Sequence, residues 1–215
     1  MEKPVVIVLA TKNQGKLKEM KNMLSDFPVD FLGLDAFGPI PDVVEDGDTF
    51  DDNAYKKASF TARVLGYPVI ADDSGLVVEA LDGAPGVYSA RYAGENATDE
   101  DNNRKLLSEL DGKSNRAAAF QCVISIAVPT GPALTYEGRC EGRIAEEPSG
   151  SNGFGYDPLF VCSEHGKHFA ELSMAEKNSV SHRGKALNQM AREFDKILVW
   201  LAQNMPKLAK SECVT

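Results

Sequence analysis

Two adjacent carboxylates, Asp72 and Asp73, follow the short apolar run of residues 69–71 and precede Ser74 and Gly75. Neighbouring acids at the end of a buried strand repel each other unless a cation neutralises them, and a buried carboxylate without a partner is costly. Mg2+ characteristically takes one or two carboxylates together with substrate phosphate. We therefore expect a divalent-cation site here, although an ordinary turn is the alternative explanation.

A second acidic stretch lies upstream of this pair. Six of the eleven residues from 42 to 52 are acidic, namely Asp42, Glu45, Asp46, Asp48, Asp51 and Asp52. The spacing of an EF-hand calcium loop is missing, so that class of site is excluded. For most of these residues a solvated acidic loop is the expected outcome.

The segment of residues 11–16 carries Lys12 and Lys16 at the start of a predicted helix. The positive end of a helix dipole disfavours such cations, whereas its free N–H groups bind anions. Plain capping by Thr11 or Asn13 explains the segment equally well when it is considered alone. The misplaced lysines favour a phosphate ligand, although the segment is not a Walker A loop.

A second basic helix start follows near the other end of the chain. Ser181 is a good N-cap, yet His182, Arg183 and Lys185 occupy the first turn, with Lys177 just upstream. In isolation this pattern is more often a solvated end with weak surface ion pairs. Two such starts in one acidic chain favour a shared polyanionic ligand.

The loop of residues 153–158 interleaves two aromatic residues with glycine and an acid. Phe154 or Tyr156 could stack on a nucleobase, and Asp157 could accept a hydrogen bond from its edge. The alternative is a turn whose aromatic side chains fill the core.

The elements that position these residues are those of a mixed α/β fold. Buried strands are expected at residues 4–10 and 29–34, and a long antiparallel hairpin at residues 117–128 and 134–144. Short strands are expected at residues 69–71 and 76–78 around a turn at Ser74-Gly75, and another at residues 158–161. Helices are expected around residues 17–24, from Thr49 to Leu65, from Thr98 to Leu110, and as one long helix from Ser181 to Leu201.

Composition limits the function further. The 215 residues carry a formal net charge of −9, which argues against general binding to a nucleic-acid backbone. No signal peptide or membrane-spanning run is present, so we expect no membrane partner. The four cysteines show no metal-ligand spacing, and free thiols in the cytoplasm are the simplest interpretation.

Taken in order, these segments resemble the inosine triphosphate pyrophosphatase family of nucleotide hydrolases. The pieces that carry the resemblance are Thr11-x-Asn13-x-x-Lys16, Glu45-x-Gly47-x-Thr49-Phe50 with Asn53 and Lys57, Ala71-Asp-Asp-Ser-Gly75, Gly83-Ala-Pro-Gly86 through Ser89-Ala-Arg91-Tyr92, Phe154-Gly-Tyr-Asp-Pro158, and Lys177 with Ser181-His-Arg-Gly184. Each piece is weak alone, whereas the ordered set is specific and covers nearly the whole chain.

The resemblance implies a role for each matching residue. The triphosphate would be held by Thr11, Lys12, Asn13, Gln14, Gly15 and Lys16, with Lys57 adding charge. Mg2+ would be held by Glu45, Asp72 and Asp73. Asp73 would also accept the proton of the attacking water, and Ser74 would touch the substrate. The base would be stacked and read by Phe154, Gly155, Tyr156 and Asp157, with Lys177, His182 and Arg183 closing around it.

The same resemblance implies an elongated mixed β-sheet flanked by helices, with two lobes and a central nucleotide cleft. Residues 1–207 would form one two-lobed domain, and residues 208–215 a C-terminal tail. The expected activity is hydrolysis of ITP, dITP or XTP by a homodimer. The alternatives are a Maf-like pyrophosphatase for modified pyrimidine nucleotides and a nucleotide-binding module without turnover.

Overall fold

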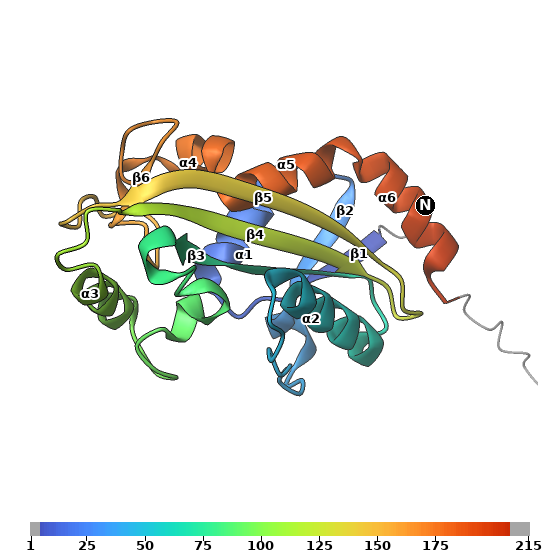
Figure 1. Ribbon diagram of the computed structural model, residues 1–215. Helices are drawn as coiled ribbons and strands as arrows, with labels where there is room; N and C mark the ends of the chain where they lie inside the picture. Colours follow the sequence, from blue (N-terminus) through green and yellow to red (C-terminus); the bar gives the residue numbers. More distant parts are fainter. Residues whose placement is uncertain (1–4, 207–215) are drawn as a thin grey trace, which may run out of the picture.

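Three long strands form the spine of the computed structural model, which describes residues 5–206 (Figure 1). They are β3 (Val69–Val78), β4 (Ala117–Ala127) and β5 (Ala133–Ile144). The shorter strands β1 (Val5–Leu9), β2 (Val29–Gly33) and β6 (Phe160–Cys162) complete a sheet of order β2-β1-β3-β4-β5-β6. β1 runs parallel to β2 and β3, and the remaining neighbours are antiparallel. The predicted mixed sheet is therefore confirmed.

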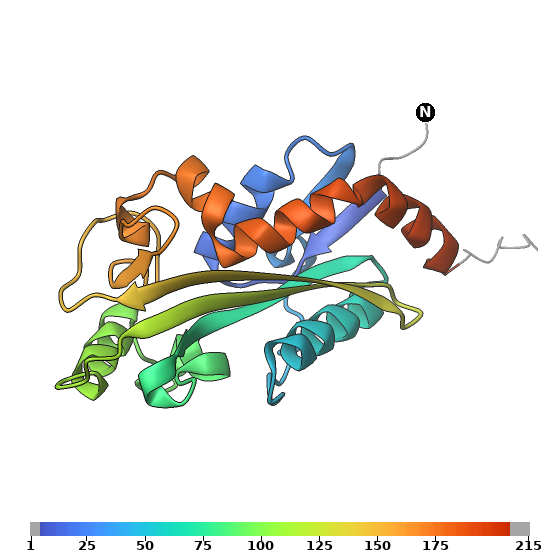
Figure 2. The same cartoon turned by 45° about the horizontal axis from the view of Figure 1, so that its top comes forward.

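Helices cover both sides of the sheet (Figure 2). On one side lie α1 (Gln14–Met23) and α5 (His182–Arg192), and on the other side α2 (Phe50–Leu65) packs against β3 and β4. The remaining helices are α3 (Asp99–Glu109), α4 (Met174–Val180) and α6 (Phe194–Asn204), with short 3-10 helices η1 (Leu34–Phe37), η2 (Glu79–Leu81), η3 (Gly86–Arg91) and η4 (Phe169–Glu171). Among the helices of residues 5–206, none combines the length and apolar character needed to cross a bilayer.

The two largest of the four apolar clusters among the described residues lie in different parts of the sheet, as the two predicted lobes require. One core gathers Ile7, Met20 and Phe194 around α1, α5 and α6, and the other gathers Leu106, Phe160 and Phe169 around α3 and β6. Strands of ten to twelve residues are long enough to pass through both cores, because each residue adds about 3.3 Å. The expected tail of residues 208–215 lies outside the described residues.

The predicted site residues lie near the point where β1 leaves β3. These two strands pair only at Val8↔Val69 and Leu9↔Ile70, so β1 ends before Asp72 and Asp73 are reached. The edge of β3 beyond Ile70 is therefore open to the loop that leads into α1. Ligands in α/β folds commonly bind beyond the carboxyl end of such a strand.

One strand prediction was wrong. Residues 69–71 and 76–78 are not two strands around a turn, because β4 pairs with β3 without a break from Val69 to Val78. Gly75 is required by crowding rather than by a turn: a Cβ at this position would lie 2.3 Å from the carbonyl oxygen of Gly86. The acidic pair consequently sits inside a strand and not at its end.

The last predicted helix is in fact two helices. The helical hydrogen-bond pattern is interrupted at Glu193, whose N–H donates to the carbonyl oxygens of Ala191 and Met190. α6 then begins at Phe194. The apolar stripe continues across the break, since Leu187, Phe194 and Leu201 belong to the same core. Hydrophobic periodicity alone therefore could not reveal the break.

Candidate active site

A cavity of about 860 Å³ opens beside the exposed edge of β3. Both lobes contribute to its wall. The residues around it come from the start of α1, the acidic loop, α2, β3, η3, the start of α3, the loop of residues 154–157 and the start of α5, and they include Thr11, Lys12, Asn13, Lys16, Glu45, Lys57, Asp73, Ser74, Phe154, Gly155, Tyr156, Asp157, His182 and Arg183. Most of the predicted site residues are thus brought to one place.

The start of α1 forms one wall of this cavity. Asn13 is the N-cap, and its Oδ1 accepts from the backbone N–H of Lys16 at 3.0 Å, so the capping question is decided in favour of Asn13. The first turn contains no acid. Lys12 pairs with Asp42 of the acidic loop at the exposed rim, whereas Gln14 is exposed and does not line the cavity. The free end of the helix and Lys16 therefore remain suited to an anion.

Asp72 and Asp73 point to opposite faces of β3, because side chains alternate along a strand. Asp72 faces the side of α1 and α5, with Ile70 of the first core, and Asp73 faces the side of α2. Each carboxylate has its own cations. The repulsion expected between adjacent acids is thereby reduced without a shared ion, although Asp72 still contributes to the raised pKa of Asp73.

On the α2 face, Lys57 lies between two carboxylates. Its Nζ is 3.0 Å from Glu45 Oε2 and 3.6 Å from Asp73 Oδ1, and it donates to the carbonyl oxygen of Asp72. Burial raises the pKa of Asp73 above the ordinary 3.8, because Lys57 and Lys16 only partly offset the loss of water. Burial alone would lower the pKa of Lys57, but the surrounding carboxylates raise it overall. A proton acceptor and a fixed positive charge are therefore side by side.

Asn53 was not assigned a role from the sequence, although it holds this carboxylate in place. It is buried, donates to Asp73 Oδ2 at 3.2 Å, and accepts from the backbone N–H of Gly47 at 2.8 Å. The acidic loop that carries Glu45 is thus tied to Asp73 through one side chain.

On the opposite face, Asp72 forms a buried ion pair with Arg183. The Nη2 and Nε atoms of Arg183 lie 3.0 and 3.2 Å from Asp72 Oδ2, and Lys16 Nζ lies 3.0 Å from the same oxygen. Burial alone would raise the pKa of Asp72, but Lys16, Arg183 and Lys57 hold it far below its usual range. Its Oδ1 is buried without a partner among the described residues.

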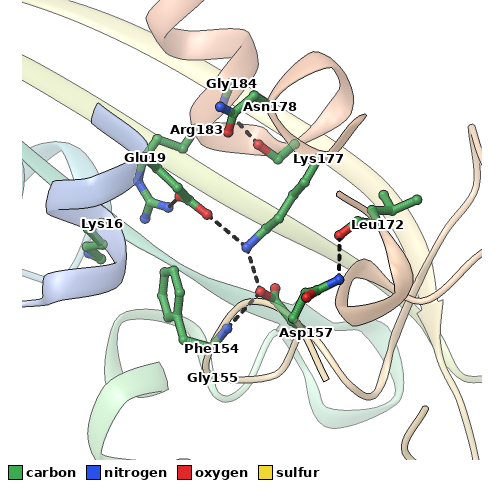
Figure 3. Close-up of polar contacts among 12 residues, drawn as sticks. Lys16, Glu19, Phe154, Gly155, Asp157, Leu172, Lys177, Asn178, Arg183 and Gly184 are labelled. Carbon is green, nitrogen blue, oxygen red and sulfur yellow. Dashed lines mark hydrogen bonds and ion pairs between the residues drawn. The ribbon is translucent and has the colours of Figure 1, made fainter. Parts of the chain in front are cut away.

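Glu19 of α1 is a buried acid whose importance the sequence did not indicate. It pairs with Nη1 of Arg183 and, at 2.9 Å, with Nζ of Lys177 (Figure 3). Burial would raise the pKa of Glu19, but these two cations lower it. Its partners are distant in sequence, so local spacing carried no signal of this bridge.

The two aromatic residues of the predicted base loop, both beside the cavity, differ in burial. Phe154 is half-buried, with Lys177 Nζ 4.8 Å from its ring centroid. Tyr156 is buried in the second core and donates to the carbonyl oxygen of Ser89 at 2.8 Å. Asp157 accepts from Lys177 at 2.5 Å and from the N–H of Phe154 at 3.0 Å, and burial raises its pKa despite Lys177. Asp157 therefore holds the loop together.

His182 stands beside Arg183 at the start of α5. Its ring stacks on Phe120 with centroids 4.7 Å apart and an interplanar angle of 10°. Burial, together with Arg183 and Lys177, holds the pKa of His182 well below 6.5, so the ring is neutral near pH 7. Its Nδ1 is buried without a partner in the described part of the chain.

Comparisons with known proteins show the family of this chain. Residues 7–193 match the model of the Ham1 family. The dITP/XTP pyrophosphatase of Desulfotalea psychrophila is 62% identical over 200 residues, covering 93% of this chain and 90% of its own, and that of Syntrophobacter fumaroxidans is 61% identical, covering 91% and 84%.

Solved structures show the same fold. A HAM1 protein from Coxiella burnetii superposes with a TM-score of 0.82 at 45% identity, covering 89% of this chain and 99% of its own. The Ham1 protein of Staphylococcus aureus gives a TM-score of 0.80 at 43% identity, with the same coverage.

Proposed function

Because this chain belongs to the Ham1 family, we propose that it hydrolyses the non-standard purine nucleotides ITP, dITP and XTP to the monophosphate and pyrophosphate. Such turnover would remove these nucleotides before they enter DNA or RNA. The proposal rests on one cavity, which is lined by Lys16, Lys57, the buried carboxylate of Asp73, and Phe154 beside Arg183. These are the groups that a triphosphate, an attacking water and a purine require.

The proposed reaction uses groups from both faces of β3. Water attacks the α-phosphorus, its proton passes to Asp73, and the bond to the leaving pyrophosphate breaks. Lys16, Lys57 and the N–H groups at the start of α1 stabilise the charge that develops on the phosphates. A carboxylate with a raised pKa is a better proton acceptor than an ordinary one, which suits Asp73 to this step.

We propose Mg2+ as the cofactor. Residues 5–206 contain no group of three or more His, Cys, Asp or Glu side chains able to hold a metal by themselves, and Mg2+ commonly completes its shell with phosphate and water. Glu45 and Asp73 fit this pattern, because both approach the same Nζ of Lys57. When bound, the ion would neutralise phosphate oxygens and polarise the scissile bond. Asp72, predicted from the sequence as a further ligand, has its Oδ2 engaged by Arg183 and Lys16, whereas its Oδ1 has no partner among the described residues.

For the base, we propose stacking on Phe154 and reading by His182 and Arg183. Hypoxanthine and xanthine present a 6-oxo acceptor, whereas adenine presents an amino donor that leaves a donor in the site unpaired. The unpaired Nδ1 of His182 supports this role. Arg183 already gives its Nε, Nη1 and Nη2 atoms to Asp72, Glu19 and Ser74, so a base would meet a guanidinium held firmly in place.

The remaining proposals concern assembly and location. We propose a homodimer, as the family resemblance implies, and a location in the cytoplasm. Cys122, Cys140 and Cys162 are buried free thiols, which is the state expected in a reducing compartment.

A substrate panel with pyrophosphate detection tests the function. ITP, dITP and XTP should be hydrolysed with kcat/KM at least about a hundredfold above ATP, and excess EDTA should stop the reaction. Preference for modified pyrimidine nucleotides would favour the Maf-like alternative. Tight binding of ITP without pyrophosphate release would favour the non-catalytic alternative, and full turnover in EDTA would contradict the role of Mg2+.

A further inference from the structure

Gly15 of α1 and Phe154 of the base loop are in direct contact, although they lie far apart in sequence. A Cβ built on Gly15 would lie 2.4 Å from Cδ1, 2.7 Å from Cε1 and 3.0 Å from Cγ of Phe154. Carbon atoms make their best contact at about 3.5–4.0 Å, so these distances are strongly repulsive. The aromatic ring therefore occupies the volume of a side chain that residue 15 lacks.

The backbone of Phe154 is fixed on both sides, so it cannot shift to make room. Its own N–H donates to Asp157 Oδ2. The next residue, Gly155, donates its N–H to Asp99 at 2.6 Å and accepts from Asn103 at 3.0 Å through its carbonyl oxygen. Any side chain at position 15 would consequently displace the ring itself.

The backbone conformation at this position does not require glycine. Gly15 lies in the first turn of α1, and its φ is outside the left-handed region that favours glycine. Alanine is the strongest helix former and glycine one of the weakest, so alanine here would favour the helix. The requirement at this position is therefore space for the ring.

Two cations, Lys177 and Arg183, also lie close to the ring of Phe154. Lys177 Nζ lies 4.8 Å and Arg183 Cζ 5.9 Å from its centroid, as Figure 3 illustrates for the side chains around Phe154. Cations at such distances are attracted to an aromatic face. Phe154 is thus placed between the start of the phosphate-binding helix and the cations of the base site.

We propose that Gly15 is a positioning residue. The space left by its missing side chain, here called the seat, holds the ring of Phe154, and this contact sets where the ring meets a purine base. This inference rests on the proposed function, because it takes Phe154 as the stacking residue. The first turn of α1 then serves both ends of a purine nucleoside triphosphate. Its N–H groups face the phosphates, and its bare Cα supports the base-stacking ring.

A mutant cycle of Gly15→Ala, Phe154→Ala and the double variant tests the seat. Gly15→Ala should lower kcat/KM for ITP about tenfold in the wild-type background, but by less than about twofold when Phe154 is already alanine, because coupled residues are non-additive. Inhibition by inorganic tripolyphosphate, which has no base, should stay within about twofold. Lys18→Ala, at an exposed position of the same helix, is the matched control and should keep wild-type kinetics.

Two kinetic outcomes would overturn the proposal. Equal weakening of ITP and tripolyphosphate would make Gly15 a phosphate-site residue, and an undiminished effect in the Phe154→Ala background would show that Gly15 does not act through the ring.

Melting temperatures separate a failure of this inference from a failure of the proposed function. Alanine at position 15 should raise the melting temperature more in the Phe154→Ala background than in the wild type, whether or not ITP is hydrolysed. No such difference would contradict the seat alone, whereas absence of ITP hydrolysis by the unaltered protein would contradict the function and the stacking role with it.

Discussion

Asp72 and Arg183 form a buried ion pair on the face of β3 opposite to Asp73, with 3.0 Å between Oδ2 and Nη2. Both side chains are almost fully shielded from water, and Glu19 completes the arrangement from α1. An unpaired charge in such a place costs much more than an exposed one. Arg183, which we propose to read the base, is therefore also a structural element.

Arg183→Met should consequently destabilise the fold. The substitution leaves Asp72 and Glu19 without their shared partner, so we expect a loss of about 3 kcal/mol. For a chain of this size that corresponds to a fall in melting temperature of roughly 6–12 °C. Arg104→Met removes an arginine that is exposed and pairs only at the surface, and it should change stability by less than about 0.5 kcal/mol. Equal melting temperatures for the two variants would show that the buried pair contributes nothing.

His182→Phe tests base reading. Phenylalanine keeps a ring that can stack on Phe120 but has no Nδ1, so only the proposed hydrogen bond to the 6-oxo group is removed. The kcat/KM for ITP should fall by about 1 kcal/mol, or roughly fivefold, while that for ATP changes little. A parallel fall for both nucleotides would show that His182 does not distinguish the bases.

Lys16→Ala should weaken binding of ITP much more than binding of IMP, because the proposed partner of Lys16 is the phosphate chain. The lysine also neutralises Asp72 at 3.0 Å, so some loss of stability is expected as well. Dissociation constants for both nucleotides, measured well below the melting temperature, separate these effects. Equal losses for ITP and IMP would place Lys16 outside the phosphate site.

The pH dependence of turnover should show the raised pKa of Asp73. Only the carboxylate accepts a proton, so kcat/KM must fall as the pH falls through this pKa, and burial places the midpoint above the ordinary 3.8. Lys57 opposes that rise. Removing it in Lys57→Met should therefore move the acid limb to higher pH, in addition to reducing the rate. An acid limb that stays in place would mean that Asp73 is not the group that titrates.

Much of this molecule could be predicted from its sequence because the relevant signals are local. The helix start at Thr49 is an example, since Thr49 accepts from the N–H of Asp52 and Gly66 ends the helix in the left-handed conformation. The hairpin of β4 and β5 likewise followed from two strand-like segments, residues 117–128 and 134–144, joined by the turn Pro129-Thr-Gly-Pro132.

The features that escaped prediction depend on partners remote in sequence. β3 continues through Ser74 and Gly75 because β4 pairs with it and η3 presses against it. Glu19 resembles an ordinary helix surface residue until Lys177 and Arg183 are brought to it. The separation of Asp72 from Asp73 follows from strand alternation, which becomes visible only once the strand is known to be unbroken.

The most direct measurement is pyrophosphate release from ITP by Asp73→Asn. Asparagine keeps the size of the side chain but cannot take the proton of the attacking water, so turnover should fall by at least about a hundredfold while affinity for ITP is largely kept. Affinity for Mg2+ should be measured alongside, because Asp73 is proposed to hold the ion as well. Activity within tenfold of the wild type would contradict Asp73 as the catalytic base.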